Sequence, residues 1–539
     1  MKRGILLILV TMLFMGACTG KEATVDEAGA EEERLENLTA AGEMPIVKDQ
    51  ITLNFFAGRA ATTNKDWNDV LVFNEYEEIS NIDIEWEMIP REGLEEKRNL
   101  TLVNDKLPDV FHTAGLPNND LMKYGEQGAF LKLNDLIEEH MPNLNRILEE
   151  NPDIKKGMTF PDGSIYSLPT IYDPDFPSLL VGSKFWIRED WLEELNMTMP
   201  QTTDDYYEYL KAVKETDLNG NGKNDEIPFG GTSITGLFQW LTGSFGIQNR
   251  GRNHGFIDLD PETENLRFFP IEDEYKELLE YMHKLYSEGL IQSNIYTVET
   301  NESYAQGAEG LYGSTVQSST VTAYGHEEGD KFVGMPTLEG PNGDRLFTKL
   351  GSPLANMGGF VITSDNEHPE ATVRWMDYFY GDEGAKLFFM GVEDITYKTN
   401  EDGTLEYLDE IDNNPDGLTF AEALSKYMTW SGGGYPGIVM EDYFNGAESM
   451  EPSIIATEEL IPYFPEEVWP QFTFTNEESK ELASLASDIE KYVGEMRDKF
   501  ITGNVSLDEW DSYIAEIKKM GLEEYMEIQE NAYERYKNN

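Results

Sequence analysis

Ten residues in the middle of the chain, DLNGNGKNDE at positions 217–226, have the types and spacing of a loop that binds a cation. Carboxylate and amide side chains alternate there with glycines, and oxygen atoms are the ligands that Ca²⁺ prefers. The loop follows the EF-hand pattern until Pro228, which stands where that pattern has its last glutamate, so Glu226 has to supply the final carboxylate. The predicted calcium ligands are Asp217, Asn219, Asn221, Lys223 through its backbone carbonyl, Asp225 and Glu226.

The segments that flank this loop differ from those of a paired helix-loop-helix sensor. Upstream, Tyr206, Leu210 and Val213 recur at helical spacing. Downstream, Ile227 precedes a proline, which favours extended backbone. We therefore expect a helix, the loop and a strand, with a structural Ca²⁺ ion in the loop. The alternative is a surface turn without an ion, because Asn, Asp and Gly are also ordinary turn residues.

The first residues of the chain have the pattern of a secretory signal. Lys2 and Arg3 precede an apolar run at 5–14, which is too short to remain in a bilayer as a spanning helix. The sequence MGAC then ends in Cys18, the only cysteine, and resembles a bacterial lipobox. We expect 1–17 to be a lipoprotein signal peptide and Cys18 to be lipidated, which anchors the protein at the extracellular face of the cell membrane. The alternative is a plain signal peptide with an incidental cysteine.

The segment that follows Cys18 is acidic and poor in aromatic residues. It cannot bury enough apolar surface to offset its ordering entropy, so we expect 18–47 to be a flexible tether. The remaining body is too long for one hydrophobic core and should form at least two domains.

The charge of the chain restricts its partners. It has 102 acidic and 41 basic residues, which gives a formal net charge of −61. A nucleic-acid partner is excluded, because phosphate binding needs the opposite sign. The same balance favours a neutral ligand over a uronate, because on average it repels anions.

The sequence lacks the usual motifs of catalysis. There are six histidines and no HExxH, GxSxG or GxxxxGK[ST] pattern. Pairs of carboxylates carry little information in so acidic a chain, although a glycosidase would need one such pair in a cleft. We therefore predict that the protein is not an enzyme. The alternatives that stay open are a secreted glycoside-active enzyme and a surface carbohydrate adhesin.

Strand-like and helix-like segments alternate in the first part of the body. ITLNFFAG at 51–58, IDIEWEMI at 82–89 and LPDVFHT at 107–113 have the composition of strands, and helical periodicity lies between the first two. Strand, helix and strand in this order predict parallel βαβ units of an α/β fold.

A series of blocks makes a family resemblance specific. They include PDGSIYSLP at 161–169, FWIREDWLEEL at 185–195, the block at 358–393 and the tail from 501. In this order they resemble the extracellular solute-binding lipoproteins of ABC sugar importers, and among these the alginate-oligosaccharide binding proteins. The resemblance covers nearly the whole chain after the signal, and it also includes a structural calcium loop that matches 217–226.

The resemblance implies a type II periplasmic-binding-protein-like fold, in which two α/β lobes close on a ligand. It places 48–168 and 350–400 in the first lobe, and 169–349 and 401–539 in the second. It also implies that a monomer captures an oligosaccharide and delivers it to ABC permease subunits.

Candidate ligand contacts follow from where such a ligand lies. In open α/β sheets ligands bind beyond the carboxyl ends of strands, and sugars stack on aromatic faces. The candidates are Arg59, Asn64, Trp67, Asn68, His112 and Thr113 in the first lobe, and Trp186, Arg188, Trp240, Trp430 and Tyr435 in the second. Trp430 is the preferred stacking residue, because the glycines beside it leave few neighbours to bury its ring.

Overall fold

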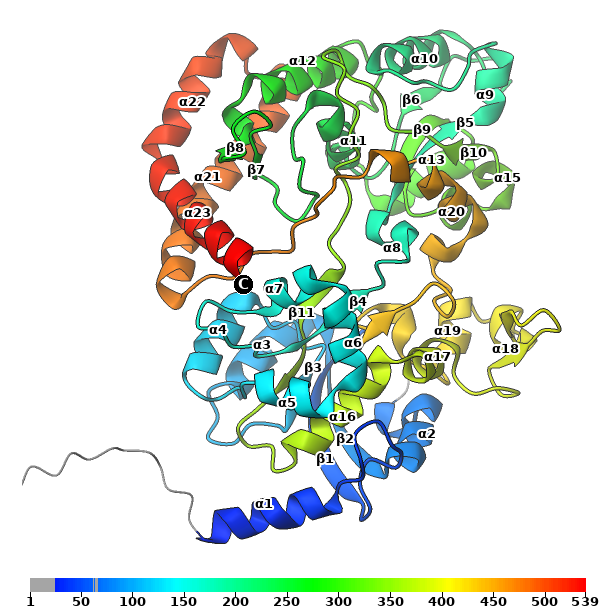
Figure 1. Cartoon of the computed structure of the whole chain (residues 1–539). Coiled ribbons are helices and arrows are strands. Elements are labelled where there is room, and N and C mark those ends of the chain that lie inside the picture. The colour runs from blue at the N-terminus through cyan, green and yellow to red at the C-terminus, as the bar shows by residue number, and fades with distance from the viewer. Residues whose placement is uncertain (1–24, 62, 64–65) are drawn as a thin grey trace, which may run out of the picture.

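The computed structural model describes residues 25–61, 63 and 66–539. The chain forms two α/β lobes, which lie one above the other in Figure 1. Among the described residues, no helix has both the length and the apolar character needed to cross a membrane. The predicted signal peptide and Cys18 lie outside these residues.

The first lobe, the lower one in Figure 1, is built on a six-stranded sheet. Its strands are, in spatial order, β14 (Ile438–Val439), β4 (Leu168–Tyr172), β11 (Leu354–Ile362), β3 (Val110–His112), β1 (Ile51–Arg59) and β2 (Ile82–Pro90). β1 pairs in parallel with β2 and β3, whereas β11 runs antiparallel to both β3 and β4. The predicted strands at 51–58, 82–89 and 107–113 are therefore confirmed, with small changes at their ends.

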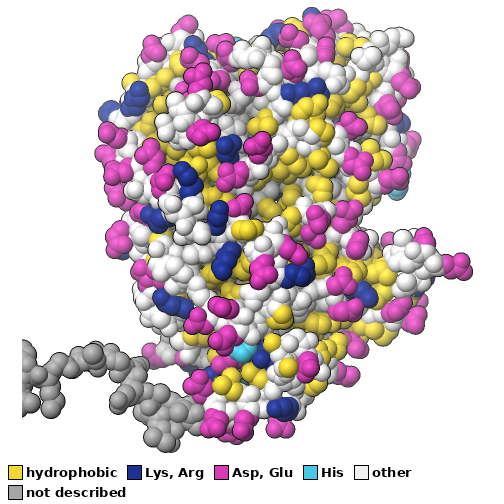
Figure 2. Space-filling view, viewed as in Figure 1, with side chains coloured by type: hydrophobic (Ala, Val, Ile, Leu, Met, Phe, Trp, Pro, Cys, Tyr) yellow, Lys and Arg dark blue, Asp and Glu magenta, His cyan; other side chains and the backbone are white. Residues whose placement is uncertain are grey.

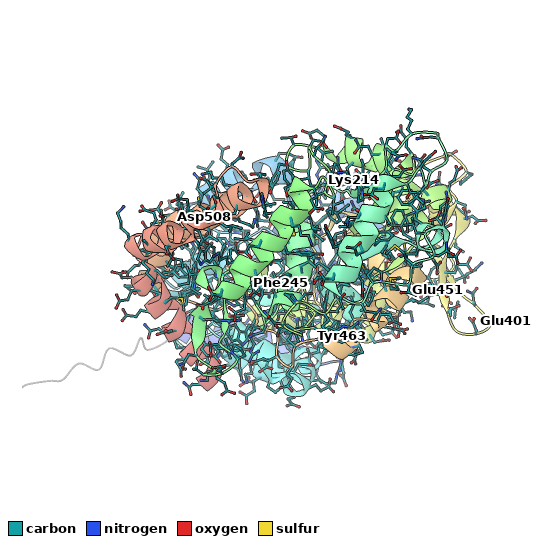
Figure 3. All side chains as sticks on the ribbon, turned by 90° about the horizontal axis from the view of Figure 1, so that it is seen from above. Lys214, Phe245, Glu401, Glu451, Tyr463 and Asp508 are labelled. Carbon is teal, nitrogen blue, oxygen red and sulfur yellow. The ribbon has the colours of Figure 1, made fainter. Side chains whose placement is uncertain are left out.

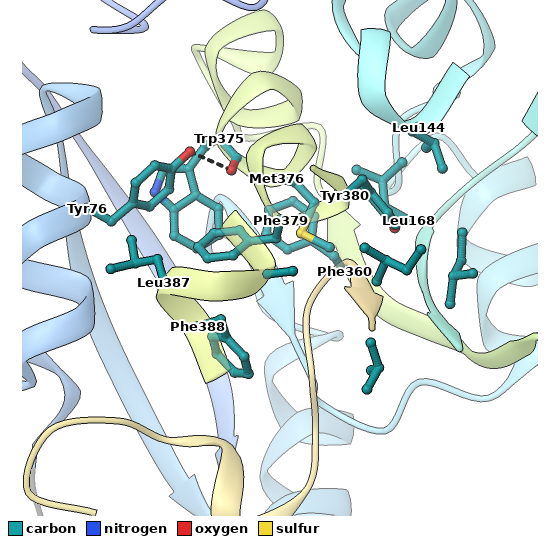
Figure 4. Close-up of a cluster of buried hydrophobic side chains, with 14 of the residues drawn as sticks. Tyr76, Leu144, Leu168, Phe360, Trp375, Met376, Phe379, Tyr380, Leu387 and Phe388 are labelled. Carbon is teal, nitrogen blue, oxygen red and sulfur yellow. Dashed lines mark hydrogen bonds between the residues drawn. The ribbon is translucent and has the colours of Figure 1, made fainter. Parts of the chain in front are cut away.

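Both faces are covered at the centre of this sheet. Phe55 and Phe56, which are successive residues of β1, belong to two different core clusters, as expected when side chains alternate across a covered sheet. Figure 4 shows the larger cluster, in which the hydroxyl group of Tyr76 donates to the backbone carbonyl of Trp375 at 2.8 Å. The helices of this lobe are α1 (Val25–Asn37), α2 (Leu71–Ser80), α3 (Arg91–Thr101), α4 (Asn118–Glu126), α5 (Asn134–His140), α6 (Pro142–Glu150), α7 (Pro152–Met158), α16 (Pro369–Asp377), α17 (Asp382–Met390), α18 (Asp409–Asp412) and α19 (Phe420–Leu424).

The second lobe has a smaller sheet and more helix. Its four strands are, in spatial order, β10 (Phe332–Gly334), β5 (Lys184–Arg188), β9 (Tyr312–Gln317) and β6 (Ile227–Phe229). Its helices are α8 (Pro177–Val181), α9 (Glu189–Glu194), α10 (Thr203–Glu215), α11 (Ile234–Leu241), α12 (Asp273–Ser287), α13 (Thr300–Ala308), α14 (Thr320–Tyr324), α15 (His326–Gly329), α20 (Glu451–Glu458), α21 (Asn476–Thr502), α22 (Trp510–Lys519) and α23 (Leu522–Asn538). Seen from above, α10 and α12 lie on the outer face of this lobe, and Lys214 marks the end of α10 (Figure 3).

Two small hairpins complete the secondary structure. β7 (Ile257–Leu259) pairs with β8 (Leu266–Phe268) in the second lobe. β12 (Tyr397–Thr399) pairs with β13 (Leu405–Tyr407) in a region that protrudes from the first lobe, at the right of Figure 1.

The boundary expected between the lobes needs a correction. We expected 401–539 in the second lobe, but β14 pairs with β4 in the first sheet. Buried residues up to Phe444 belong to the first core, and the second core resumes at Leu460. The sequence hides this because β14 is only two residues long and has no periodic pattern of its own.

From Val25 onward, the segment at 18–47 is not a structureless tether. α1 begins at Val25, and Arg34 on this helix pairs with Glu370 of α16 at 2.7 Å. Ile46 is fully buried in the first core. A short apolar stretch thus docks on the lobe although the composition around it is acidic.

The chain segments that cross between the lobes hydrogen-bond to each other. The backbone N–H of Tyr172, at the end of β4, donates to the carbonyl of Pro353 at 2.8 Å. The N–H of Gly351 donates to the carbonyl of Leu180 at 3.0 Å. This paired crossing joins the two lobes.

Candidate functional site

A cavity of about 620 Å³ lies between the two lobes, and we call it the interlobe cavity. It is lined by residues 116–119 and 354–358 of the first lobe, by residues 252–253 of the second lobe and by Gln471. Residues 116–119 follow the carboxyl end of β3, which is the position where open α/β sheets bind ligands. Figure 1 shows α4 and β11 at the border with the second lobe.

The lining of the interlobe cavity is rich in amides. It contains Asn118, Asn119, Asn253, Asn356 and Gln471 together with Arg252, and it contains no carboxylate. An amide side chain both donates and accepts hydrogen bonds, so such a wall suits a ligand with many hydroxyl groups. The absence of acidic groups in this lining contrasts with the net charge of −61.

The first-lobe wall is held by contacts around the loop after β3. Arg98 of α3 donates to the carbonyl groups of Ala114 and Gly115. Gly358 of β11 leaves room for the same loop, because a Cβ atom there would lie 2.2 Å from the carbonyl oxygen of Leu116. The loop therefore presents the start of α4 to the cavity from a fixed position.

The second-lobe wall is fixed to the crossing segments. The backbone N–H of Arg252 donates to the carbonyl of Leu350 at 2.9 Å. Its guanidinium donates to the carbonyl of Val181 at 3.3 Å. Gly251 has φ +84°, and a Cβ atom there would lie 2.7 Å from the Leu350 carbonyl oxygen, so this tight approach requires glycine.

Two predicted aromatic contacts of the second lobe lie in its interior instead. Trp186 is 1 % exposed and its indole N–H donates to the carbonyl of Gln317 at 2.8 Å. Trp240 is buried in the second core, where it packs against Phe185 and Phe347. A sheet that helices cover on both faces needs large buried side chains for its packing. The prediction that Trp186 and Trp240 contact a ligand is therefore corrected.

Arg188 is also an interior residue. It is 3 % exposed and forms ion pairs with Asp190 at 2.6 Å and with Glu328 at 2.8 Å. These two carboxylates raise the pKa of Arg188 against the effect of burial. Its charge is neutralised within the lobe, so the prediction that it binds ligand is corrected.

Two predicted contacts of the first lobe are core residues. Trp67 packs against Trp86, and His112 packs against Trp86 and Phe55. Both are buried, and burial lowers the pKa of His112 to about 3, which keeps the imidazole neutral. Neither ring offers a face to a ligand, which corrects the expectation that both lie in a binding loop.

The polar groups of the same region bond to their own chain. The guanidinium of Arg59 donates to the carbonyl of Thr63 at 2.8 Å. The side-chain carbonyl of Asn68 accepts the backbone N–H of Trp86 at 2.9 Å. Asn64 lies outside the described residues.

The preferred stacking residue is covered by rings from other segments. Trp430 is 5 % exposed, and it packs against Phe389 and Phe444. Its indole N–H donates to the carbonyl of Phe389 at 3.0 Å. The prediction that this ring is exposed is corrected. The glycines beside Trp430 have no side chains to cover it, but residues distant in the sequence do. Trp430 instead borders a second cavity of about 700 Å³ beside the β12–β13 hairpin.

Thr113 and Tyr435 both lie in the first lobe, where Thr113 directly follows β3 and Tyr435 packs against the core. Both are half-buried, and a Cβ atom on Gly434 would lie 3.3 Å from Thr113. Their assignment as ligand contacts stays a prediction.

The residues that line the cavity were missed by the sequence analysis. Asn118 and Asn119 follow the loop that was singled out after the third strand and could have been found by extending it. Arg252, Asn356 and Gln471 lie far apart in the chain, and nothing in their local sequence marks them.

The loop at 217–226 connects α10 to β6, so the predicted helix, loop and strand are observed. Both carboxylate oxygens of Asp217 accept backbone N–H groups, from Asn221 at 3.1 Å and from Gly222 at 2.8 Å. Asp225 accepts the side-chain amide of Asn221 at 2.8 Å, and this hydrogen bond lowers the pKa of Asp225. In the part of the chain that the structure describes, no group of three or more His, Cys, Asp or Glu side chains is gathered to hold a metal.

Glu226 differs from the other acidic residues of the loop. It is buried, and its Oε1 atom accepts the backbone N–H groups of Leu218 at 2.8 Å and Asn219 at 3.0 Å. Its Oε2 atom is buried and has no hydrogen-bond partner among the described residues. A buried carboxylate oxygen without a donor is costly, and a cation in the loop would satisfy it.

The two lobes, the hinge and the shared polar cavity define a two-lobed solute-binding protein. The chain belongs to the bacterial extracellular solute-binding protein family, whose model matches residues 61–386. This confirms the predicted family and fold class, and membership of a family of binding proteins confirms the prediction that the chain is not an enzyme.

Individual relatives cover nearly the whole chain. The fructooligosaccharide ABC transporter substrate-binding protein FusA of Streptococcus pneumoniae is 30% identical over 99% of this chain and 98% of its own length. A structure of an EF-hand mutant of FusA with fructo-nystose has a TM-score of 0.71 at 27% identity, and the match covers 91% of this chain and 100% of FusA. A human-milk-oligosaccharide (HMO) binding protein from Bifidobacterium longum infantis shares the fold, with a TM-score of 0.75 at 22% identity over 90% of this chain and 99% of its own.

Proposed function

We propose that this protein is the substrate-binding component of an ABC importer and that it captures an oligosaccharide in the interlobe cavity. The observation that carries this proposal is the amide-rich lining, to which both lobes contribute. The name of FusA, which describes a fructooligosaccharide ABC transporter substrate-binding protein, supports it. The partners would be ABC permease subunits, and we expect the protein to act as a monomer.

Capture depends on contacts that exist only when both lobes touch the ligand. Asn119 and Asn356 reach the cavity from the first lobe, and Arg252 and Asn253 reach it from the second. A ligand that hydrogen-bonds to both sets stabilises the closed arrangement, because it binds that arrangement more tightly than the open one. The paired crossing at Tyr172 can act as the hinge for this movement.

Removal of one amide should weaken sugar binding without affecting the fold. We expect the purified protein to bind fructooligosaccharides or another neutral or acidic oligosaccharide in calorimetry. In the Asn119→Ala variant the affinity should fall by roughly two- to tenfold, since one hydrogen bond contributes about 0.5–1.5 kcal/mol. Asn119 is exposed at the second position of α4.

Asn301→Ala is the matched control for this test, because Asn301 is exposed at the second position of α13 and does not line the cavity. Its affinity should equal that of the wild type. Chromatography of the incubated sugars should show no new products. Release of a shorter sugar would contradict the binding function, and equal losses in both variants would contradict the position of the ligand.

We propose that the loop at 217–226 holds a structural Ca²⁺ ion. The residues that would hold it are Asp217, Asn219, Asn221, Lys223 through its carbonyl, Asp225 and Glu226. The buried Oε2 atom of Glu226 supports this assignment because it lacks a donor among the described residues. A structure of FusA was solved for an EF-hand mutant, which gives related support. The ion would join the end of α10 to β6 and would supply no catalytic chemistry.

Chelation should therefore lower the melting temperature and leave sugar affinity nearly unchanged. An ion that binds only the folded state at about a hundredfold excess over its Kd stabilises it by roughly 2.7 kcal/mol. This corresponds to a melting shift of roughly 5 to 10 °C, measured by calorimetric scans with and without a chelator. Sugar affinity should persist because no residue of the loop lines the interlobe cavity.

Variants of the loop separate calcium binding from an ordinary turn. Asp217→Ala combined with Asp225→Ala should melt early and no longer respond to chelator. Asp402→Ala is the control, because this exposed carboxylate accepts the backbone N–H of Thr404 in a turn outside the loop. If chelator left the melting temperature of the wild type unchanged, the proposal that the loop holds a structural ion would be wrong.

We also propose that Cys18 is lipidated and holds the protein at the outer face of the cell membrane. The lipobox-like sequence at 15–18 supports this anchor. The chain belongs to a family of extracellular proteins, which supports a location outside the cell. In cell fractionation, Cys18→Ser should move the protein from the membrane fraction to the soluble one, with unchanged sugar affinity. A mutant that stays in the membrane fraction would argue against the lipid anchor.

A further inference from the structure

Three cationic side chains lie together where the chain crosses between the lobes. Arg252 lines the interlobe cavity, while Lys184 and Lys349 are buried close to it, with 0 % and 7 % of their surfaces exposed. No carboxylate of the described residues lies within 4.0 Å of any of the three. We call this group the hinge cations.

The hinge cations are solvated by backbone carbonyls around α8. The ammonium of Lys184 donates to the carbonyl of Ser178 at 2.8 Å, and that of Lys349 donates to the carbonyl of Ser183 at 3.2 Å. The guanidinium of Arg252 donates one N–H group to the carbonyl of Val181. The dipoles of these carbonyl groups orient the three side chains, but a carbonyl group carries no full negative charge.

The positive charges also act on one another. Burial, together with the charges of Arg252 and Lys184, lowers the pKa of Lys349 to about 7. Burial likewise lowers the pKa of Lys184 to about 8, and Glu448 is the one acidic group that opposes this effect. Buried positive charge that no carboxylate contacts directly destabilises a fold. The burial of Arg252 and Lys184 in a chain of net charge −61 therefore points to a role in binding.

The position of Arg252 connects this charge to the ligand. Arg252 and Asn253 line the cavity from the second lobe, and Asn119 and Asn356 line it from the first. Arginine can bind a carboxylate through two parallel hydrogen bonds, and the amides around it can bind the hydroxyl groups of a sugar ring. The combination suits a ligand that carries both kinds of group.

We propose that the interlobe cavity binds an acidic sugar and that Arg252, with Lys184 and Lys349 behind it, holds its carboxylate. This rests on the proposed function and names the class of its ligand. It replaces the expectation of a neutral ligand drawn from the net charge. Acidic side chains are scattered over the whole face seen in Figure 2, and charges farther away than about 8 Å are largely screened at physiological ionic strength. Within the cavity wall only Arg252 is charged.

The test compares ligands that differ only in charge. Calorimetry would use oligogalacturonate and oligoguluronate, their methyl esters, fructooligosaccharides, and acetate and phosphate as free anions. At least one uronate should bind roughly tenfold or more tightly than its own methyl ester, because a charged hydrogen-bonded contact contributes about 1.5–3 kcal/mol. The preference should decrease as NaCl is added.

Variants assign this preference to the hinge cations. Arg252→Gln should remove the preference for the acid over its ester, while Arg252→Lys should retain part of it. Arg250→Gln is the matched control, because Arg250 lies two residues away, pairs with Glu467 at 3.7 Å and does not line the cavity. The melting temperature of each variant shows whether it is folded.

Each outcome decides a different claim. The acidic-sugar proposal would be overturned if the protein bound fructooligosaccharides but none of the uronates. It would also be overturned if a uronate and its methyl ester bound with equal affinity. Either result would keep the oligosaccharide-binding function. Binding of acetate or phosphate as tightly as the uronate would show a free-anion site and would also overturn it. Failure of every sugar would overturn both the acidic-sugar proposal and the proposed function.

Discussion

The hydrogen-bonded crossing between the lobes is the interaction on which the rest of the structure depends. Tyr172 bonds to Pro353, and Gly351 bonds to Leu180, so these two crossing segments form one hydrogen-bonded ribbon. β11 leaves this ribbon and pairs with both β3 and β4, which places the amide-bearing end of β11 beside the loop that follows β3. The same ribbon holds Arg252 in position on the other side. The cavity and the hinge are therefore parts of one arrangement.

Local sequence patterns predicted elements better than they predicted the site. The strands at 51–58 and 82–89 and the helix, loop and strand around 217–226 follow from periodicity and turn chemistry within short windows. The β14 strand could not be predicted in this way, because a strand of two residues shows no periodicity. The apolar stretch near Ile46, which docks on the first lobe, could not be predicted from local sequence either. Tertiary pairing decides such segments.

Several of the predicted ligand contacts were wrong for a related reason. Aromatic residues near strand ends were expected to bind sugar, but two lobes covered on both sides need such residues for their cores, as Trp186 and Trp240 show. The cavity wall comes from residues such as Asn119, Arg252 and Asn356, which only the fold brings together. Net charge is a weak guide to the ligand for the same reason, since it averages over a surface whereas the cavity depends on its nearest groups.

The most direct test of the central claim, that both lobes grip one ligand, is a crystal structure with the tightest-binding oligosaccharide. The account predicts sugar density in the interlobe cavity, within hydrogen-bond distance of Asn119 or Asn356 on one side and of Arg252 or Asn253 on the other. Sugar bound only beside Trp430, or in contact with a single lobe, would contradict it.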